Sequence, residues 1–402
     1  MAHAAATQID AGSVTIPAAS SWSKLPVVGV AAALIGLGGT FAMGGFHGDG
    51  AYAYLTAYLF FFSLAVGALF FVTIHHATRA GWSVVVRRLA EILAMTLPVL
   101  ALLFVPIALA SHDLYHWTHH DVVQADPILK SKEPYLNVPF WLGRAALYFI
   151  GLGGLAYFFF KNSTAQDRTG DLALSEKMRA RSYPAIPVIA LSVTFAAFDW
   201  SMSLDPHWFS TMFGVCFFAG GMVAFFATMA ILGHSLTASG HLKGVTTEHF
   251  HDIGKFLFGF MVFWSYVNFS QFMLIWYANI PEETLWFAHR WIETGWDKVS
   301  MALALGHFVI PFFFMMSRHI KRNRTTLLVA SGWMLVMHYL DLFWQVMPTI
   351  QHHGPHFTAV HALSMLGVGG VCVAMVGVLL RKVPLVPVRD PRLSESLSFQ
   401  NY

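Results

Sequence analysis

The chain has 402 residues, of which 56% are hydrophobic and only 11% are charged. A soluble domain carries about a quarter charged residues, so this composition excludes an ordinary soluble enzyme and is typical of a protein that crosses a membrane several times. The formal net charge of +3 is too small to indicate binding to nucleic acid.

Ten apolar segments are long enough to cross the hydrocarbon core as helices, which takes roughly 20 residues each. In chain order they are 26–46, 52–76, 85–110, 139–161, 184–204, 209–233, 251–279, 299–319, 325–350 and 357–380. Lipid offers the backbone no hydrogen-bond partner, so these segments must be helical. We therefore predict an all-α, polytopic membrane domain over 26–380, with a flexible tail at 1–25, the first span as an uncleaved insertion signal, and a second tail at 381–402.

Most of the 24 lysines and arginines lie in the two tails and in the alternate loops on the same side. By the positive-inside rule this side is cytoplasmic, so we expect both termini in the cytoplasm.

A spacing recurs in the two halves of the chain. Asp199 stands seven residues before Pro206 near the end of the fifth segment, and Asp341 stands seven residues before Pro348 in the ninth. This coincidence suggests two parallel four-helix bundles, at about 52–204 and 209–350, flanked by the first and last helices.

The two cysteines, Cys216 and Cys372, both lie inside apolar segments. Two cysteines in such places exclude a disulfide framework, a c-type haem motif and a cysteine-ligated iron–sulfur cluster within this chain. Any redox metal would therefore belong to partner subunits.

Two opposite charges fall inside neighbouring apolar segments. A charged side chain at mid-membrane costs about 2.5–3.5 kcal/mol, so Arg144 and Asp199 are expected to pair. The pair could simply fix helix packing, or it could bind a quinone carbonyl or relay protons. The two interpretations are compatible.

The second half holds a further set of polar residues. His338, Asp341 and Gln345 share one helical face, since they stand at i, i+3 and i+7. They could line a proton path, or they could be interhelical hydrogen-bonding groups of the kind common in membrane bundles. The full set of proton-path candidates comprises Glu91, Asp252, Lys255, Gln271, His307, His338, Asp341 and His361.

The stretch HDLYHWTHHD, residues 112–121, follows the third segment on the predicted outer side. His112, His116 and His120 have a spacing that zinc could use on a helix, and haem would need facing histidines at two depths. Neither a second set of ligands nor such a pair of depths is evident, so we expect no metal here. Histidine titrates near pH 6.5, so the stretch suits proton transfer.

Several stretches resemble one family closely. They are HDLYHWTHHDVVQADPILKSKEPYLNVPFWLGR (112–144), FDWSMSLDPHWFSTMFG (198–214), EHFHDIGKFLFGFMVFWSYVNFSQFMLIWYANIPEET (248–284), GHFVIPFFFMMSR (306–318) and HYLDLFWQVMP (338–348). Their order and spacing resemble the ActF family of membrane subunits of bacterial alternative complex III, which is similar to NrfD/PsrC-type subunits. The resemblance extends from about residue 25 to 380.

This resemblance implies a multi-pass subunit of a quinol:electron acceptor oxidoreductase in the bacterial cytoplasmic (inner) membrane. It implies menaquinone or menaquinol as the cofactor, with no haem or iron–sulfur cluster in this chain. The implied partners are a sister NrfD-like membrane subunit, a periplasmic iron–sulfur subunit, haem c subunits, small membrane subunits and lipid. The motifs place five candidate quinone-binding residues in this chain: His112, Asp113, Arg144, Asp199 and Asp205.

Two other functions stay open at this point. The chain could be a structural anchor whose outer loops, 111–138 and 280–298, dock the periplasmic subunits. It could also be an ion-coupled transporter acting alone, although no broken-helix binding site is evident.

Overall fold

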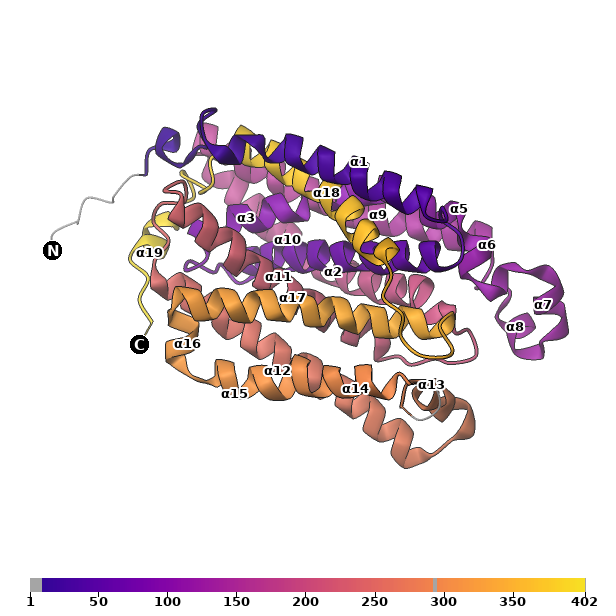
Figure 1. The fold of residues 1–402 in the computed structure, drawn as a ribbon. Helices are drawn as coiled ribbons and strands as arrows, with labels where there is room; N and C mark the ends of the chain where they lie inside the picture. Colours follow the sequence, from indigo (N-terminus) through magenta and orange to yellow (C-terminus); the bar gives the residue numbers. More distant parts are fainter. Residues whose placement is uncertain (1–8, 292–294, 402) are drawn as a thin grey trace.

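The computed structural model describes residues 9–291 and 295–401, and helices make up the regular secondary structure of these residues. The long helices lie side by side in one elongated body (Figure 1). Within the described ranges, ten helices are long and apolar enough to cross a membrane. The predicted all-α fold with ten membrane-spanning helices is therefore confirmed at this level.

Each spanning helix overlaps one predicted segment. Their bounds are Ser21–Ala42, Asp49–Ala77, Val84–Leu109, Val138–Thr169, Leu172–Leu204, Phe213–Ala238, Thr247–Ala278, Asp297–Met316, Arg324–Thr349 and Ala359–Lys382. The individual helices are α1 (Leu25–Ala42), α2 (Asp49–Ala77), α3 (Val84–Ala94), α4 (Leu97–Leu103), α5 (Val105–Leu109), α6 (Ser111–Leu114), α7 (His120–Ala125), α8 (Pro127–Lys132), α9 (Val138–Thr169), α10 (Leu172–Trp200), α11 (Phe213–Ala238), α12 (Thr247–Ala278), α13 (Pro281–Trp291), α14 (Asp297–Leu303), the π-helix η5 (Ala304–Val309), α15 (Ile310–Met316), α16 (Arg318–Arg322), α17 (Arg324–Val346), α18 (Ala359–Lys382) and α19 (Leu393–Leu397).

Short 3-10 turns, η1 (Ala11–Val14), η2 (Ser21–Lys24), η3 (His116–Thr118), η4 (Met202–Leu204) and η6 (Met347–Thr349), complete the helical elements.

Helices α9 and α10 are longer than the apolar segments predicted at 139–161 and 184–204. They meet at Gly170, whose backbone has a positive φ of 69°, and the Asp171 side chain then caps α10 by accepting from the Ala173 amide at 2.8 Å. The hydrophobic pattern ends where the polar residues begin, whereas the helices continue until this turn stops them.

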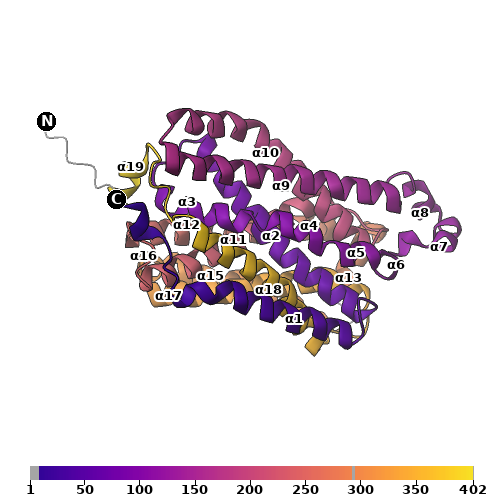
Figure 2. The same cartoon turned by 90° about the horizontal axis from the view of Figure 1, so that it is seen from above.

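Helix α1 lies against α18, as Figure 2 shows from above. Glycines allow the close approach, because a Cβ at Gly36 would come within 2.1 Å of the Gly367 backbone nitrogen. Small residues in facing positions are a common basis for helix packing in membranes, where lipid is as apolar as the side chains.

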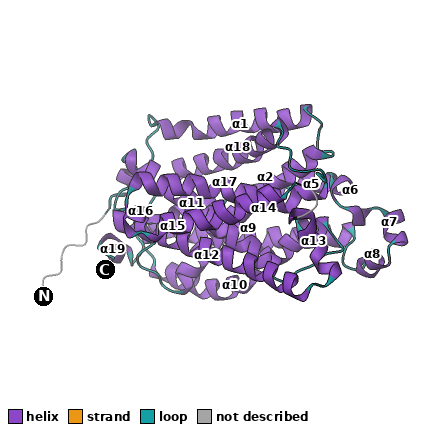
Figure 3. Ribbon diagram, turned by 60° about the horizontal axis from the view of Figure 1, so that its bottom comes forward, coloured by secondary structure: helices purple, strands orange, loops and turns teal. Residues whose placement is uncertain are grey.

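Helix α2 lies at the centre of the body and is buried along most of its length. It contacts α3, α10, α11, α17 and α18, and α11 in turn contacts α12 and α17. Short helices α7 and α8 lie at one end of the body and α16 and α19 at the other (Figure 3). We refer to these as the α7 end and the α19 end.

Candidate functional site

Arg144 of α9 and Asp199 of α10 form the pair that the sequence predicts. The guanidinium makes two parallel bonds, from Nε to Oδ2 and from Nη2 to Oδ1, each 2.8 Å long. The Arg144 side chain is 8% exposed and the Asp199 side chain is not exposed. A bidentate contact is the strongest geometry available to these two groups.

Neighbouring residues form further hydrogen bonds with both members of this pair. Tyr148 donates its hydroxyl to Asp199 Oδ2 at 2.7 Å, and Arg144 Nη1 donates to the Tyr135 carbonyl at 2.9 Å. The guanidinium also lies 3.8 Å from the centre of the Tyr135 ring and 4.4 Å from that of Phe140. Asp199 is therefore both neutralised and fully hydrogen-bonded.

A largely apolar hollow of about 400 Å³ lies beside the pair. It is lined by Lys132, Tyr135, Leu136, Phe195, Phe198, Met202, Ser203, Pro206, Trp208 and Phe209. We call it the α10 hollow. Its Ser203 hydroxyl already donates to the Asp199 carbonyl at 2.7 Å, so the wall offers few free polar groups.

The structure distributes the five quinone-binding candidates over three places. Arg144 and Asp199 form the buried pair, while Asp113 is exposed and contacts His47 at 2.6 Å. The ring of His112 lies 3.8 Å from that of His119. Asp205 lines a separate polar hollow.

That polar hollow, of about 260 Å³, lies at the α7 end. It is lined by His116, Val122, Asp126, Leu129, Leu204, Asp205, Pro206, His207, His289, Arg290, Pro348, Thr349 and His352. His207 contacts Asp126 at 2.5 Å, and this hydrogen bond holds the pKa of the Asp126 carboxyl below its ordinary range. In the described part of the chain, no three His, Cys, Asp or Glu side chains are arranged to hold a metal ion.

Asp341 of α17 is buried but has no cation beside it in the described structure. Its side chain accepts a hydrogen bond from Trp264 Nε1 to Oδ2 at 3.0 Å and lies beside the Gln345 side chain, while Oδ1 has no partner at hydrogen-bond geometry among the described residues. Leaving a buried carboxylate with a single neutral donor is costly. The Asp341 carboxyl is therefore a candidate for binding a ligand or exchanging a proton.

One histidine lies next to Asp341, and a second stacks on the tryptophan that donates to it. His338, one helical turn earlier, bonds through Nε2 to the Ser63 hydroxyl at 2.9 Å and leaves Nδ1 without a described partner. His307 stacks on Trp264 with 3.7 Å between ring centres, and both of its nitrogens lack a partner among the described residues. Both side chains are fully buried.

The π-helix η5 sets the position of His307. This wider turn frees the Gly306 carbonyl, which accepts from Trp333 Nε1 at 2.7 Å. Single π-turns inside α-helices are frequent at functional sites, because the extra residue redirects the side chains around it.

A larger cavity, of about 540 Å³, opens beside Asp341. Its lining comes from α12, α13, α14, η5 and α17: Val262, Trp264, Ser265, Tyr266, Asn268, Phe269, Gln271, Phe272, Phe287, Trp291, Ser300, Leu303, Ala304, Phe308, Val309, Asp341 and Trp344. We call it the α12–α14 cavity. It brings two proton-path candidates, Gln271 and Asp341, to one wall.

Other proton-path candidates lie apart from this cavity. His361 is three residues into α18 and caps it, with Nδ1 3.0 Å from the Thr358 hydroxyl. At the α19 end, Asp252 pairs with Lys255, which also donates to Asn401 at 2.8 Å.

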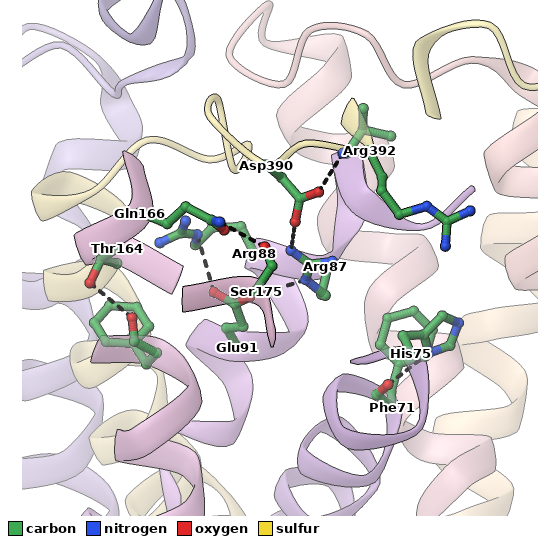
Figure 4. A network of polar contacts seen from close by, with 12 residues as sticks. Phe71, His75, Arg87, Arg88, Glu91, Thr164, Gln166, Ser175, Asp390 and Arg392 are labelled. Carbon is green, nitrogen blue, oxygen red and sulfur yellow. Dashed lines mark hydrogen bonds and ion pairs between the residues drawn. The ribbon is translucent and has the colours of Figure 1, made fainter. Parts of the chain in front are cut away.

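Glu91 belongs to an ion cluster at the α19 end, shown in Figure 4. It contacts Arg87 at 3.3 Å and Arg88 at 3.2 Å, Arg87 contacts Asp390 at 2.5 Å, and Arg88 contacts Asp167 at 2.6 Å. Both arginines lie in α3, near the start of the predicted segment 85–110, and they are 3% and 0% exposed.

The two predicted tails contribute packed residues at this end. Leu385 donates its amide to the carbonyl of Val14, and both side chains are buried. Ser396 of α19 donates to the Trp82 carbonyl at 2.6 Å and accepts from the Val85 amide at 3.2 Å. The structure does not describe residues 1–8 of the N-terminal tail, or residues 292–294 of the predicted docking loop 280–298.

Two residues at or beside the α12–α14 cavity, Trp264 and Arg290, were not among the predicted site residues. Trp264 shares a helical face with Asn268 and Gln271, at i, i+4 and i+7, and that spacing was a usable signal. Arg290, taken as a loop residue, is 2% exposed and donates to the carbonyls of Trp286, Trp344 and Gln345. Nothing in the sequence around Arg290 indicates that burial.

The chain matches no protein-family model and no curated protein sequence. Its functional class therefore rests on the fold and on the buried groups described above.

Proposed function

We propose that this chain is a membrane subunit of a bacterial quinol:electron acceptor oxidoreductase of the alternative complex III type, in which it supports menaquinol oxidation and conducts protons. The observation that carries the proposal is Asp341, which is buried in a membrane-spanning helix without a cation among the described residues, beside buried His338 and one ring away from buried His307. Ionisable residues in membrane spans are costly to keep, and they mark ion and proton pathways.

The contacts among helices support the predicted grouping into two bundles. The first would comprise α2, α3 to α5, α9 and α10, and the second α11, α12, α14 to α15 and α17, with α1 and α18 flanking them. The α19 end would face the cytoplasm, because most of the basic loop residues belong to it. The α7 end, with its histidines, would then face the periplasm.

The proposal includes the partners and the cofactor that the family resemblance implies. Menaquinol would donate electrons to metal centres in a periplasmic iron–sulfur subunit and haem c subunits, beside a sister NrfD-like subunit, small membrane subunits and lipid. This chain would supply polar side chains that accept and pass on protons. Histidine suits that role, because one ring nitrogen can accept a proton while the other donates one.

A proton route in the second bundle is supported by the position of its polar groups. A Cβ at Gly220 would meet His338 Nδ1 at 2.9 Å and Asp341 Oδ2 at 3.5 Å, so the two side chains border the same small space. His307 stacks on Trp264, and neither of its ring nitrogens has a hydrogen-bond partner among the described residues. Together these groups can hold a proton near the middle of the bundle.

The test is Asp341→Asn in the complex purified through a tag on this chain. Asparagine keeps the shape and can accept from Trp264, but it cannot take up a proton. We expect quinol turnover and coupled proton release to fall by about 100-fold, the scale of general acid–base catalysis. Asp10→Asn, the same chemical change on an exposed residue of the predicted N-terminal tail, is the matched control.

Subunit composition and the unfolding temperature should stay as in the wild type for both variants. Wild-type turnover and proton release in an intact Asp341→Asn complex would contradict the proposal.

A further inference from the structure

The α12–α14 cavity has a wall that faces away from the helical body. Tyr266 and Phe269 on this side are 66% and 61% exposed, on a helix long and apolar enough to span the membrane. Side chains so placed in a spanning helix contact lipid. A molecule dissolved in the bilayer can therefore enter the cavity sideways without passing through water.

The lining of the cavity fits a planar ring. Trp264, Phe272, Phe287, Trp291 and Trp344 supply aromatic faces, and offset or edge-on contacts between such rings are favourable. The volume of about 540 Å³ lies within the range of pockets that bind small molecules, roughly 300–1,000 Å³.

The cavity also has a specific polar partner on its inner wall. Asp341 is 1% exposed, and its Oδ1 accepts no hydrogen bond from the described residues. By contrast, the Ser300 hydroxyl donates to the Arg290 carbonyl at 2.7 Å and accepts from Trp344 Nε1 at 2.8 Å. The unused acceptor Oδ1 suits a ligand that donates one hydrogen bond from a ring, in a cavity whose other polar lining residues are Ser265, Asn268, Gln271 and Ser300.

We propose that the α12–α14 cavity binds the ring of a lipid-soluble quinol, with a ring hydroxyl donating to Asp341 Oδ1 and the isoprenoid chain leaving between Tyr266 and Phe269 into the bilayer. This inference rests on the proposed function and gives it a location. The step is binding alone. Electrons leave through the partner subunits' metal centres.

The α10 hollow is a poorer fit for the same ring. Both carboxylate oxygens of Asp199 are taken by Arg144 and Tyr148, so the free buried group of this hollow is the neutral Tyr135 hydroxyl and not a carboxylate. Of the five residues that the sequence motifs suggested for quinone binding, only Arg144 and Asp199 lie beside the α10 hollow, and none of the five lines the α12–α14 cavity.

The experiment uses the purified complex and a photoreactive naphthoquinone that carries an azido group and a short isoprenoid chain. After illumination, mass spectrometry locates the labelled peptides. We expect label on residues 262–272 of α12 and 300–309 of α14 and η5. Excess menaquinone analogue without the azide should prevent the labelling.

Ala304→Trp is the decisive variant, because Ala304 lines the cavity and is itself exposed, so a larger side chain fills the pocket without disturbing the core. We expect the KM for quinol to rise about tenfold or more, as pocket changes of this kind do, and the label to disappear. Leu305→Trp, one residue on and 44% exposed outside the cavity lining, is the matched control and should behave as wild type.

Three results would overturn the inference. The first is label confined to the α10 hollow or to partner subunits. The second is unchanged labelling and an unchanged KM in Ala304→Trp. The third is a phospholipid chain that occupies the cavity in a structure of the quinol-treated complex. If these occur while Asp341→Asn still abolishes turnover, the proposed function stands and only the location fails. If no quinol oxidation copurifies with the wild-type chain, both fail.

Discussion

Asp199 and Asp341 occupy equivalent places in the two halves of the chain, each seven residues before a proline and each buried. Asp199 receives two bonds from Arg144 and one from Tyr148, whereas Asp341 receives one from Trp264. This difference indicates that a buried carboxylate can have either of two roles, to stabilise helix packing or to take part in chemistry. A neutralised one fixes two helices together, and an uncompensated one is left able to react.

The largest effect on stability is expected for Arg144→Gln, which tests whether the ion pair with Asp199 is structural. This substitution leaves Asp199 buried without its cation, which costs about 3–5 kcal/mol for such pairs. We expect a lower yield and a lower unfolding temperature of the purified complex. The Asp341→Asn variant should unfold like the wild type, because it removes no ion pair.

The double variant Arg144→Gln with Asp199→Asn serves as the control for this prediction. Removing both charges should restore most of the lost stability. If the double variant is as unstable as the single one, the pair is not what Arg144 contributes.

A second pair of variants compares the two tryptophans that serve these aspartates. Trp264→Phe removes the one donor to a buried carboxylate, worth about 1.5–3 kcal/mol if Asp341 is charged. Trp141→Phe removes a donor to the Asp199 carbonyl, which also accepts from Ser203, so we expect a cost of only about 0.5–1.5 kcal/mol.

Denaturation of the two purified variants, followed by tryptophan-independent circular dichroism, measures the difference. Trp264→Phe should also lower quinol turnover, whereas Trp141→Phe should not. Equal losses of stability and activity in both would remove the distinction between the two aspartates.

A smaller substitution, Gly220→Ala, tests the space between His338 and Asp341 in the second half of the chain. In Gly220→Ala, the new methyl group would meet His338 at 2.9 Å, so we expect the ring to shift at a cost of about 1–3 kcal/mol. The expected result is reduced proton release with an intact ion pair at Arg144. Gly332→Ala on α17 has open space around it and is the matched control.

The smallest effect concerns the α7 end. The hydrogen bond from His207 lowers the pKa of Asp126, whose carboxylate also caps α8 by accepting from the Ile128 amide at 2.8 Å. A group whose pKa is lower in the folded state stabilises above its unfolded value and loses that contribution as the pH falls through the folded value.

Hydrogen exchange of peptides covering 120–132, corrected for intrinsic rates, should therefore quicken on acidification below the ordinary pKa of aspartate. In Asp126→Asn this pH dependence should vanish. An unchanged acid response in that variant would assign it to another group.

The spans and the polar face of α17 could be predicted from sequence because each depends on local pattern. Apolar length gives a span, and i, i+3, i+7 spacing places His338, Asp341 and Gln345 together. The Arg144–Asp199 pair was also predictable, since two costly charges at similar depth in neighbouring spans have few other partners.

Contacts between distant segments carry no such pattern. The ion pair between Arg87 and Asp390 could not be predicted, because the two residues are 303 positions apart in the chain. The π-turn at η5 that aims His307 has no signature in residues 304–309. The five quinone-binding candidates came from motifs, and motif order does not fix which of them share a pocket.

The contact between Arg87 and Asp390 has a consequence for how the protein is made. Arg87 enters the membrane with the third helix, when only Glu91 is at hand, and Asp390 leaves the ribosome some three hundred residues later. The α19 end can therefore close only after Asp390 has been translated. A chain that stops short of Asp390 keeps an under-compensated arginine in its interior, and we expect quality-control proteases to remove it sooner than a chain that includes Asp390.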